Sequence, residues 1–373
     1  MQIRRFIYIF IFIYLWIALP VYGQYVQAHY RTDLSDTLSE SSALLRIDSH
    51  LYSINDSGNA PIIYELDTVN GFIVRQIYVK GSENIDWEAL AQNDNYIFIG
   101  DFGNNKGNRQ NLGIYKIDKS DFLNTPNDTV EAEHISFSYQ AQTTFEELNY
   151  SNNNLDAEAL VAIGDSLYIF SKNWGNGKTY LYALSQALGT YSLIIKDSID
   201  IQALVTDATY LPEHQKIVLI AINFSSLKLI DFDVNTDNVS FGDNVNIELL
   251  NLTDSKQVEG LCFKNNGFYA TAEYFDSHNA CLYSIDSLKA TNISFIENTK
   301  NWVNCYPNPS STGQITLQSD IDLRFSVINE QGVIVSEGRT FINRVLRLPS
   351  GFYIVKVWDD NFIPIQNIKL IIL

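Results

Sequence analysis

The fold of this chain is decided by a stretch that reads EAL (88–90), YIFIGD (96–101) and LGIYKID (112–118). An acidic residue begins the stretch, and a small and an apolar residue follow it. A turn then leads into two runs that alternate apolar with polar positions and are rich in Ile, Tyr and Phe. Such runs are typical of half-buried β-strands. The stretch therefore predicts consecutive antiparallel strands joined by short turns.

The same unit recurs along residues 32–300. Its acidic residue occurs five times, at Glu40, Glu88, Glu158, Asp207 and Glu259. These positions are 48, 70, 49 and 52 residues apart. Repeats of about 40–50 residues with four short strands each are typical of β-propellers. We therefore predict an all-β chain with a five- or six-bladed β-propeller over residues 25–300. A two-sheet sandwich is the alternative.

A sixth blade would need strands from both ends of the repeat region. The segment YVQAHYR (25–31) is expected to pair with a strand near residues 292–297 and so to close the ring. The longest interval, 88–158, contains the strand-like segment TVEAEHISFSY (129–139) and a polar loop at 140–154. We expect the segment at 129–139 to be an outer strand.

Acidic residues gather where the first strand of each unit begins. The first strand of a propeller blade lines the central channel, so these acids would meet in a ring near one mouth. Asp86 and Asp156 precede two of them by two residues and therefore share a strand face. Like charges this close cannot all ionise without a counter-ion. Ca²⁺ suits such a ring, because it takes six to eight oxygen ligands in flexible geometry.

Two groups of site residues follow from this arrangement. The predicted metal ligands are Glu40, Glu88, Asp101, Glu158 and Glu259. The residues predicted to bind a ligand near them are Asp86, Asp156, Asn173, Asp207, Asn223 and Glu273. The alternative for all of them is structural, since acids at the start of an inner strand can accept hydrogen bonds from backbone amides where blades meet.

The sequence gives little support for catalysis. None of the five histidines is in register with the acidic residues, and no G-x-S-x-G motif is present. We therefore expect a binding or scaffold module for a small molecule or glycan. A metal-dependent hydrolase of an ester, lactone or phosphate is the alternative. Trp87 and Trp174 flank polar loops, where they could stack on a ligand or pack between blades.

The last seventy residues predict a second domain. Pro307 and Pro309 in CYPNP (305–309) interrupt regular structure, because proline fixes φ and lacks a donor. Period-two apolar runs follow in FSVINEQGVIV (325–335) and LPSGFYIVKV (348–357). These runs predict a small Ig-like β-sandwich over 305–373, joined to the propeller by a linker at 301–304.

The N-terminus has the features of a secretory signal. Arg4 and Arg5 precede the apolar run FIYIFIFIYLWIAL (6–19), and Val21-Tyr22-Gly23 predicts cleavage after Gly23. An uncleaved anchor is the alternative for residues 1–23. The net charge of −18 disfavours nucleic acid and anionic lipid as partners. Cys262 and Cys281 could form a disulfide in an oxidising compartment or remain buried thiols.

The order of motifs in the tail resembles the type A C-terminal sorting domain of the type IX secretion system of Bacteroidetes. That resemblance implies Sec export, transport across the outer membrane by the type IX machinery, and a final location at the cell surface or in the medium. The repeat region is loosely similar to propellers of the gluconolactonase group and of calcium-dependent phytases. This second resemblance implies that Glu40, Glu88, Glu158 and Glu259 are metal ligands.

Overall fold

The structure is a computed structural model of the chain. It describes residues 25–223, 226–235, 238–242, 244–251, 257–264, 267–275, 278–286, 303–319, 323–329, 333–339, 343–358 and 364–372. The predicted signal at 1–23, the strand expected near 292–297 and the linker at 301–302 lie outside these residues. The chain divides into two compact units, Met1–Ile293 and Ser294–Leu373.

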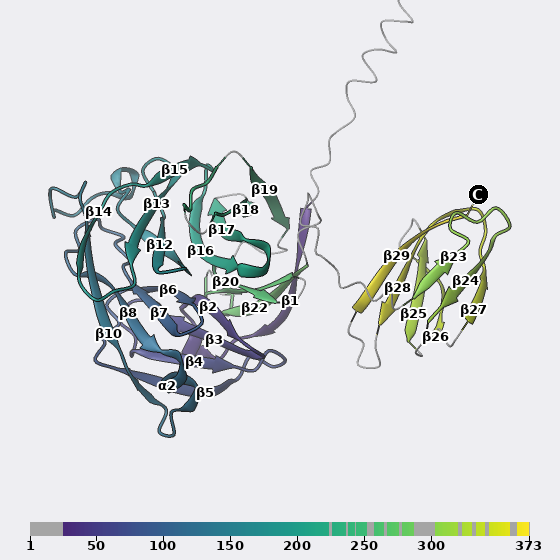
Figure 1. The fold of residues 1–373 in the computed structure, drawn as a ribbon, viewed down its shortest axis with the longest axis horizontal. Coiled ribbons are helices and arrows are strands. Elements are labelled where there is room, and N and C mark those ends of the chain that lie inside the picture. Colours follow the sequence, from purple (N-terminus) through teal and green to yellow (C-terminus); the bar gives the residue numbers. More distant parts are fainter. Residues whose placement is uncertain are drawn as a thin grey trace, which may run out of the picture. The chain divides into compact units, whose positions relative to one another are not determined.

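The chain is all-β, as the sequence predicted, and the larger unit is built from antiparallel sheets around a common centre (Figure 1). The first sheet contains β2 (Ser41–Ile47), β3 (His50–Asn55), β4 (Ile62–Leu66) and β5 (Ile73–Lys80). The second contains β6 (Trp87–Gln92), β7 (Tyr96–Asp101), β8 (Leu112–Asp118) and β10 (Glu133–Tyr139). The third contains β11 (Ala157–Ile163), β12 (Ser166–Ser171), β13 (Lys178–Ser185) and β15 (Asp197–Asp200).

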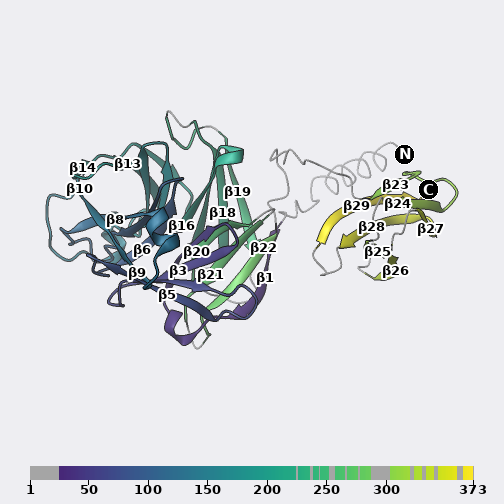
Figure 2. The ribbon, with the colours of Figure 1, turned by 60° about the horizontal axis from the view of Figure 1, so that its bottom comes forward.

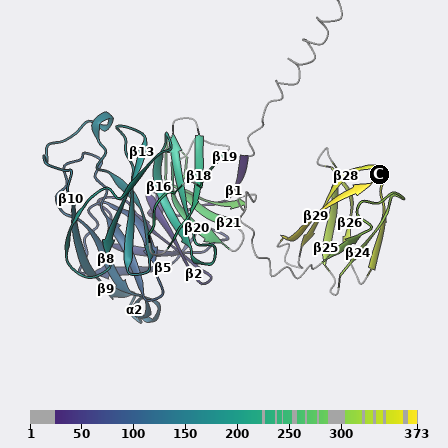
Figure 3. The same cartoon turned by 45° about the horizontal axis from the view of Figure 1, so that its top comes forward.

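The remaining strands of this unit form one 8-stranded sheet (Figure 3). Its first half is β16 (Leu204–Leu211), β17 (Lys216–Asn223), β18 (Ser226–Asp233) and β19 (Val245–Asn251). Its second half is β1 (Tyr25–Asp33), β22 (Cys281–Asp286), β21 (Gly267–Ala272) and β20 (Val258–Lys264). The short helices are η1 (Asp36–Leu38), α2 (Lys119–Asn124), η2 (Tyr150–Asn152) and η3 (Pro212–His214).

The first strands of the repeat units form a closed ring of neighbours. β2 contacts β6, β6 contacts β11, β11 contacts β16, β16 contacts β20, and β20 contacts β2. Equivalent positions on these five strands therefore converge on one axis. This propeller-like arrangement brings together residues that are up to about two hundred positions apart in the chain.

The apolar core lies in layers between neighbouring sheets. One layer joins the first and second sheets, another the second and third, and another the third sheet to the β16–β19 half of the larger one. Trp87 is fully buried in the first layer, with its ring centre 6.0 Å from that of Tyr115. Of the two roles considered for Trp87, stacking on a ligand or packing between blades, the structure shows packing between sheets.

The N-terminal strand closes the ring. Ala28–Asp33 of β1 pairs antiparallel with β22, and residues 25–27 pair in parallel with β19. The sequence predicted closure by this segment but through a partner near 292–297. Two further strands also lie parallel to an outer strand: β9 (Thr129–Glu131) pairs with β5, and β14 (Thr190–Leu193) pairs with β10. The expected outer strand at 129–139 is thus divided into β9 and β10.

The smaller unit consists of two sheets that share one core (Figure 2). One sheet contains β23 (Asn304–Tyr306), β24 (Gln314–Gln318) and β27 (Asn343–Arg347). The other contains β25 (Arg324–Asn329), β26 (Ile334–Arg339), β28 (Gly351–Trp358) and β29 (Pro364–Ile372). Leu317 and Leu346 meet Phe325 and Val355 between them, which is the burial that the period-two pattern predicted.

Two further observations bear on the sequence expectations. Cys262 and Cys281 are buried and are not joined by a disulfide, and Cys305 forms none either. None of the helices in the described part of the chain has the length and hydropathy that crossing a bilayer would require.

Candidate cation and ligand site on the inner strands

Each inner strand of the ring contains a β-bulge near its beginning. The bulge is visible as one extra residue in the pairing of β2, β6, β11, β16 and β20 with the second strand of each unit. Bulges redirect a side chain and recur next to functional sites. The bulged residues are Ser42, Glu88, Glu158, Thr206 and Glu259, and all are buried.

Two of the acids that were expected in this ring do not occupy the bulge of their strand. Glu40 precedes the bulge of β2 by two residues, is exposed, and accepts a hydrogen bond of 2.6 Å from Asn59. Asp207 follows the bulge of β16 by one residue. The expected register was wrong here because it aligned acids, whereas the equivalent residues in these two strands are the hydroxyl-bearing Ser42 and Thr206.

The hydroxyl-bearing residues connect neighbouring strands. Ser42 Oγ donates to the carbonyl of Trp87 at 2.8 Å, and Thr206 Oγ1 donates to the carbonyl of Val258 at 2.6 Å. The fully buried Asp207 carboxylate accepts backbone N–H groups on three inner strands, from Leu44 at 3.4 Å, Ala208 at 2.7 Å and Leu261 at 2.6 Å. The structural alternative therefore accounts for Asp207.

The three bulged glutamates form a buried carboxylate cluster. One oxygen of each of Glu88, Glu158 and Glu259 lies within 4.8 Å of the others. Lys172, the first residue after β12, reaches the same place, where it pairs with Glu158 and lies 3.7 Å from Glu259. Its side chain is 5 % exposed, so this ammonium group is a tethered cation inside the cluster.

Burial and mutual repulsion set the charges in this cluster. Burial, together with the carboxylates of Asp56 and Glu158, raises the pKa of Glu88 well above its usual range. Burial also raises the pKa of Glu158, against the opposing effect of Lys172. Burial alone would lower the pKa of Lys172, but the Glu158 and Glu259 carboxylates hold it well above its usual range. Lys172 is therefore charged at neutral pH.

A second cluster of three acidic side chains shares Glu88 with the first cluster. Oxygens of Asp56, Asp86 and Glu88 lie within 4.8 Å of one another. Burial and the Asp56 charge raise the pKa of Asp86 to about 8, and its protonated carboxyl donates a hydrogen bond to Asp56. Arg109 lies 3.9 Å from Asp86. At neutral pH without a bound cation, Asp86 is therefore mostly protonated.

Gly103 lies directly against this second group. A Cβ at this position would be 2.3 Å from Glu88 Oε1 and 2.5 Å from Asp86 Oδ2, both too close for any side chain. Glu88 Oε1 is buried and accepts no hydrogen bond from any described residue. The absence of a side chain at Gly103 thus leaves two carboxylate oxygens free to face the same space.

Asp101 and Asp156 have structural partners. Asp101 Oδ1 accepts hydrogen bonds from Arg109 Nη2 at 2.9 Å and from the Asp86 amide at 3.0 Å. Asp156 is fully buried and accepts the Asn104 amide at 2.6 Å and Trp174 Nε1 at 2.9 Å. Neither acid belongs to either of the two carboxylate clusters. Hydrogen bonding where strands meet therefore accounts for both of them.

The other predicted ligand-binding residues divide three ways. Asn223 closes the turn between β17 and β18 by accepting the Ser226 amide at 2.8 Å. Glu273 accepts Gln257 Nε2 at 2.5 Å, and burial together with Glu259 raises its pKa to about 8. Asn173 is fully buried, and neither end of its amide finds a partner among the described residues. Asn173 thus keeps both a donor and an acceptor available.

Sequence reasoning missed Lys172 and left Asp56 out of the predicted metal ligands, although Asp56 follows the end of a second strand. Both are the first residue after the second strand of their unit, and Glu273 occupies the same position in another unit. The amides of all three donate to carbonyls that precede the inner strand, with N···O distances of 2.9, 2.9 and 3.0 Å. This shared position was the available signal, because it lies beside the bulge across each strand pair.

The residues of the second group suit a divalent cation. Carboxylate oxygens are the ligands that Ca²⁺ takes, and its flexible geometry tolerates an irregular set. Asp56, Asp86 and Glu88 supply such oxygens, whereas Lys172 already neutralises part of the charge on Glu158 and Glu259. A cation would therefore bind at Asp56, Asp86 and Glu88 rather than between Glu158 and Glu259.

Comparison with known proteins gives likeness of fold only. Neither models of protein families nor curated proteins match the chain. Glutaminyl cyclase from Myxococcus xanthus is similar at 11% identity and a TM-score of 0.42, over 71% of this chain and 99% of that one. Exo-beta-1,3-galactanase from Phanerochaete chrysosporium has the same identity and TM-score, over 94% and 99%. The PQQ-bound aldose sugar dehydrogenase from Streptomyces coelicolor is similar at 9% identity and a TM-score of 0.41, over 72% of this chain and 99% of that one.

Proposed function

We propose that the larger unit is a five-bladed β-propeller that binds a ligand and holds Ca²⁺ at Asp56, Asp86 and Glu88. The observation that carries this proposal is Glu88 itself. Its carboxylate belongs to both clusters of acids, and its Oε1 is buried without a hydrogen-bond partner among the described residues. A buried, unpartnered oxygen is costly unless an ion, a water molecule or a ligand group satisfies it.

The electrostatics of the site favour a divalent ion. Three carboxyl groups this close cannot all be ionised without a counter-charge, and burial together with the neighbouring carboxylates raises the pKa values of Asp86 and Glu88, which favours their protonated forms. A divalent ion would replace those protons and make contacts with all three oxygens. Mg²⁺ demands near-ideal octahedral geometry, so Ca²⁺ fits an asymmetric set of three acids better.

We also propose that the protein is exported. The signal-like segment at 1–23 supports entry into the Sec pathway. The motif order in 305–373 supports an Ig-like sorting domain that is recognised by the type IX machinery. The final location would be the cell surface or the medium. Deletion of residues 305–373 is expected to leave the propeller folded in the periplasm, and normal surface delivery of the truncated protein would contradict this part of the proposal.

Binding is favoured over catalysis because several of the buried acids are already engaged by groups of the chain itself. Asp101, Asp156 and Asp207 are held by hydrogen bonds from the chain, and Lys172 is held by Glu158. The alternative of a metal-dependent hydrolase predicts turnover of a nitrophenyl ester, a lactone or a phosphate monoester with Ca²⁺ present. Turnover that Glu88→Gln abolishes would replace the binding proposal with the enzyme.

The cation site can be tested with Tb³⁺, which replaces Ca²⁺ and luminesces when a nearby indole is excited. Trp87 precedes Glu88 in the chain, and the Trp174 ring lies 5.2 Å from Lys172 Nζ. We expect saturable luminescence that Ca²⁺ competes away and that Glu88→Gln reduces at least tenfold in affinity. The control is Glu131→Gln, because Glu131 is an exposed acid that pairs with Lys80. Equal Tb³⁺ affinity in both variants would contradict the proposed site.

A further inference from the structure

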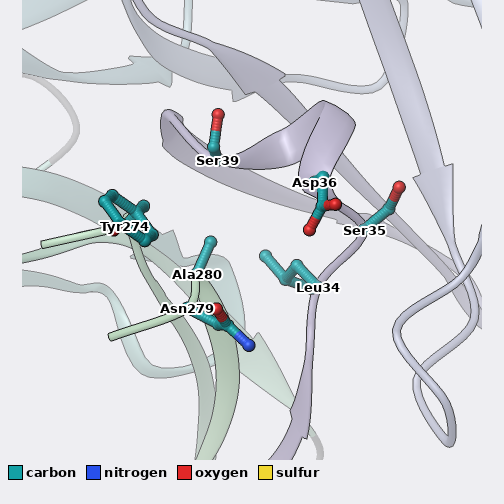
Figure 4. A pocket seen from close by; sticks show the side chains of 7 residues that line it. All are labelled: Leu34, Ser35, Asp36, Ser39, Tyr274, Asn279 and Ala280. Carbon is teal, nitrogen blue, oxygen red and sulfur yellow. The ribbon is translucent and has the colours of Figure 1, made fainter. Parts of the chain in front are cut away.

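A separate cavity of about 300 Å³ lies between the segment 34–39 on one side and Tyr274, Asn279 and Ala280 on the other (Figure 4). Backbone hydrogen bonds join the two walls: Leu34 N to the Ala280 carbonyl at 2.8 Å, and Tyr274 N to the Ser39 carbonyl at 2.7 Å. Its volume is at the lower end of the range for small-molecule sites. The cavity is thus formed by the folded backbone and is sized for a small ligand.

The η1 turn that forms one wall of the cavity is held in place by the apolar core and by hydrogen bonds. Leu38 is fully buried in the core that β2 and β3 share with β22. Asn55 Nδ2 donates to the Thr37 carbonyl at 2.6 Å, and Ser35 Oγ accepts the Thr37 amide. The position of Asp36, between these anchors, is therefore fixed by the chain on both sides.

The lining combines one aromatic ring with several small polar groups. Tyr274 is 54% exposed, so a ligand can reach its ring. The side chains of Asp36, Ser39 and Tyr274 form no hydrogen bond with any described residue, while Asn279 Nδ2 donates to Asp33 at 3.1 Å. A carboxylate, a serine hydroxyl and a phenol therefore remain available around a single aromatic surface.

From this lining we infer that the cavity binds one ring of a neutral saccharide. The C–H groups of a sugar ring can pack on the Tyr274 face, whose negative potential favours such contacts. Adjacent sugar hydroxyls can donate to Asp36 and exchange hydrogen bonds with Ser39. A purely apolar ligand would instead leave those polar groups without partners, which costs free energy.

Charge restricts the class of saccharide. The lining contains Asp36 and no Lys or Arg, and the whole chain has a net charge of −18. Uronic acids and sulfated sugars would be repelled by this field. The ligand is therefore a neutral glycan rather than an anionic one.

This inference names the ligand class of the proposed binding module and rests on that function, but it does not require the cation. Ser39 precedes Glu40, and Tyr274 follows Glu273, whose pKa is raised by burial and then by the nearby carboxylates of Glu259 and Asp56. The cavity is thus on the side of the ring where the carboxyl groups lie. Saccharide binding and cation binding can be measured separately.

Affinity electrophoresis of the mature chain tests the inference. The gels contain laminarin, xylan, galactan or galactomannan as neutral probes, and polygalacturonate as the anionic probe. We expect retardation by at least one neutral glycan, unchanged by EDTA, and at least tenfold weaker with Tyr274→Ala. Asp36→Asn, a change at an exposed turn, should weaken binding severalfold without altering the fold. Phe275→Ala is the matched control, because Phe275 is 43% exposed but outside the lining.

Four results would overturn the inference. The first three are no retardation by any neutral glycan, retardation by polygalacturonate alone, and retardation that survives both Tyr274→Ala and Asp36→Asn. The fourth is loss of retardation in EDTA, since binding would then depend on the cation. A failed Tb³⁺ titration with intact glycan binding would contradict only the cation site.

Discussion

Replacing Lys172 with Met should destabilise the larger unit strongly, because it leaves a buried cluster of acids without its cation. The ammonium group pairs with Glu158 and lies 3.7 Å from Glu259. The side chains of Lys172 and Glu259 are 5% and 7% exposed. At an effective dielectric constant of about 20, the interaction across that distance is about 4 kcal/mol. Removal of one partner of a buried ion pair typically costs about 3–5 kcal/mol.

That cost should depend on the second partner. In Lys172→Met, Glu158 must take up a proton or remain an unpaired buried charge, so the loss should be smaller at pH 5 than at pH 8. In the double variant Lys172→Met/Glu158→Gln, both members of the pair are neutral. Neutral replacement of a buried pair can be close to neutral for stability. We therefore expect a coupling energy of about 2–4 kcal/mol.

Thermal unfolding of the protein and its variants measures this cycle. A loss of about 3–5 kcal/mol corresponds to a fall of roughly 10 °C in Tm for a domain of this size. Lys80→Met is the control, because Lys80 forms an exposed pair with Glu131, and such pairs contribute about 0–1 kcal/mol. The reasoning is refuted if Lys172→Met and Lys80→Met lower the Tm equally, or if the coupling energy is within about 0.5 kcal/mol of zero.

Three further predictions concern the cluster of Asp56, Asp86 and Glu88 and the residues around it. Gly103→Ala should abolish Tb³⁺ binding, because its Cβ would occupy the space between Glu88 and Asp86, whereas Gly189→Ala, with no contact closer than 3.5 Å, should not. In EDTA, Tm should fall by a few degrees as pH rises from 5 to 8.5, because Asp86 and Glu273 have folded pKa values of about 8, above their unfolded values, and lose stabilising protons on the way. Saturating Ca²⁺ should remove the part of that fall that is due to Asp86, and a Tm that rises with pH in EDTA would contradict the charge assignment. Lys172→Met should also tighten Tb³⁺ binding severalfold, since the competing ammonium is gone, and unchanged affinity would show that Lys172 and the cation do not interact.

The general architecture was predictable from the repeat. Alternating runs identified the strands, and the spacing of Glu88, Glu158 and Glu259 placed three side chains on one ring. The register in the other two units was not predictable, because the defining feature is a bulge that the sequence does not display. Ser42 and Thr206 occupy it with hydroxyl groups, so a search for acids selected Glu40 and Asp207 instead.

The cation inside the site was missed for a related reason. A search for oxygen ligands passes over a lysine, although Lys172 is at the same position after its second strand as Asp56 and Glu273. The sequence analysis also did not identify β19 and β22 as partners of β1, and the strand that it expected near 292–297 lies outside the described residues. Strand pairing across more than two hundred residues depends on the closed ring, which local patterns do not contain.

Anomalous diffraction from crystals of the protein soaked in Tb³⁺ tests the central claim most directly. The account predicts one strong peak within about 2.3–2.6 Å of carboxylate oxygens of Asp56, Asp86 and Glu88. It also predicts that this peak is absent from crystals of Glu88→Gln. A peak only at exposed surface acids, or a peak that persists in that variant, would contradict the account.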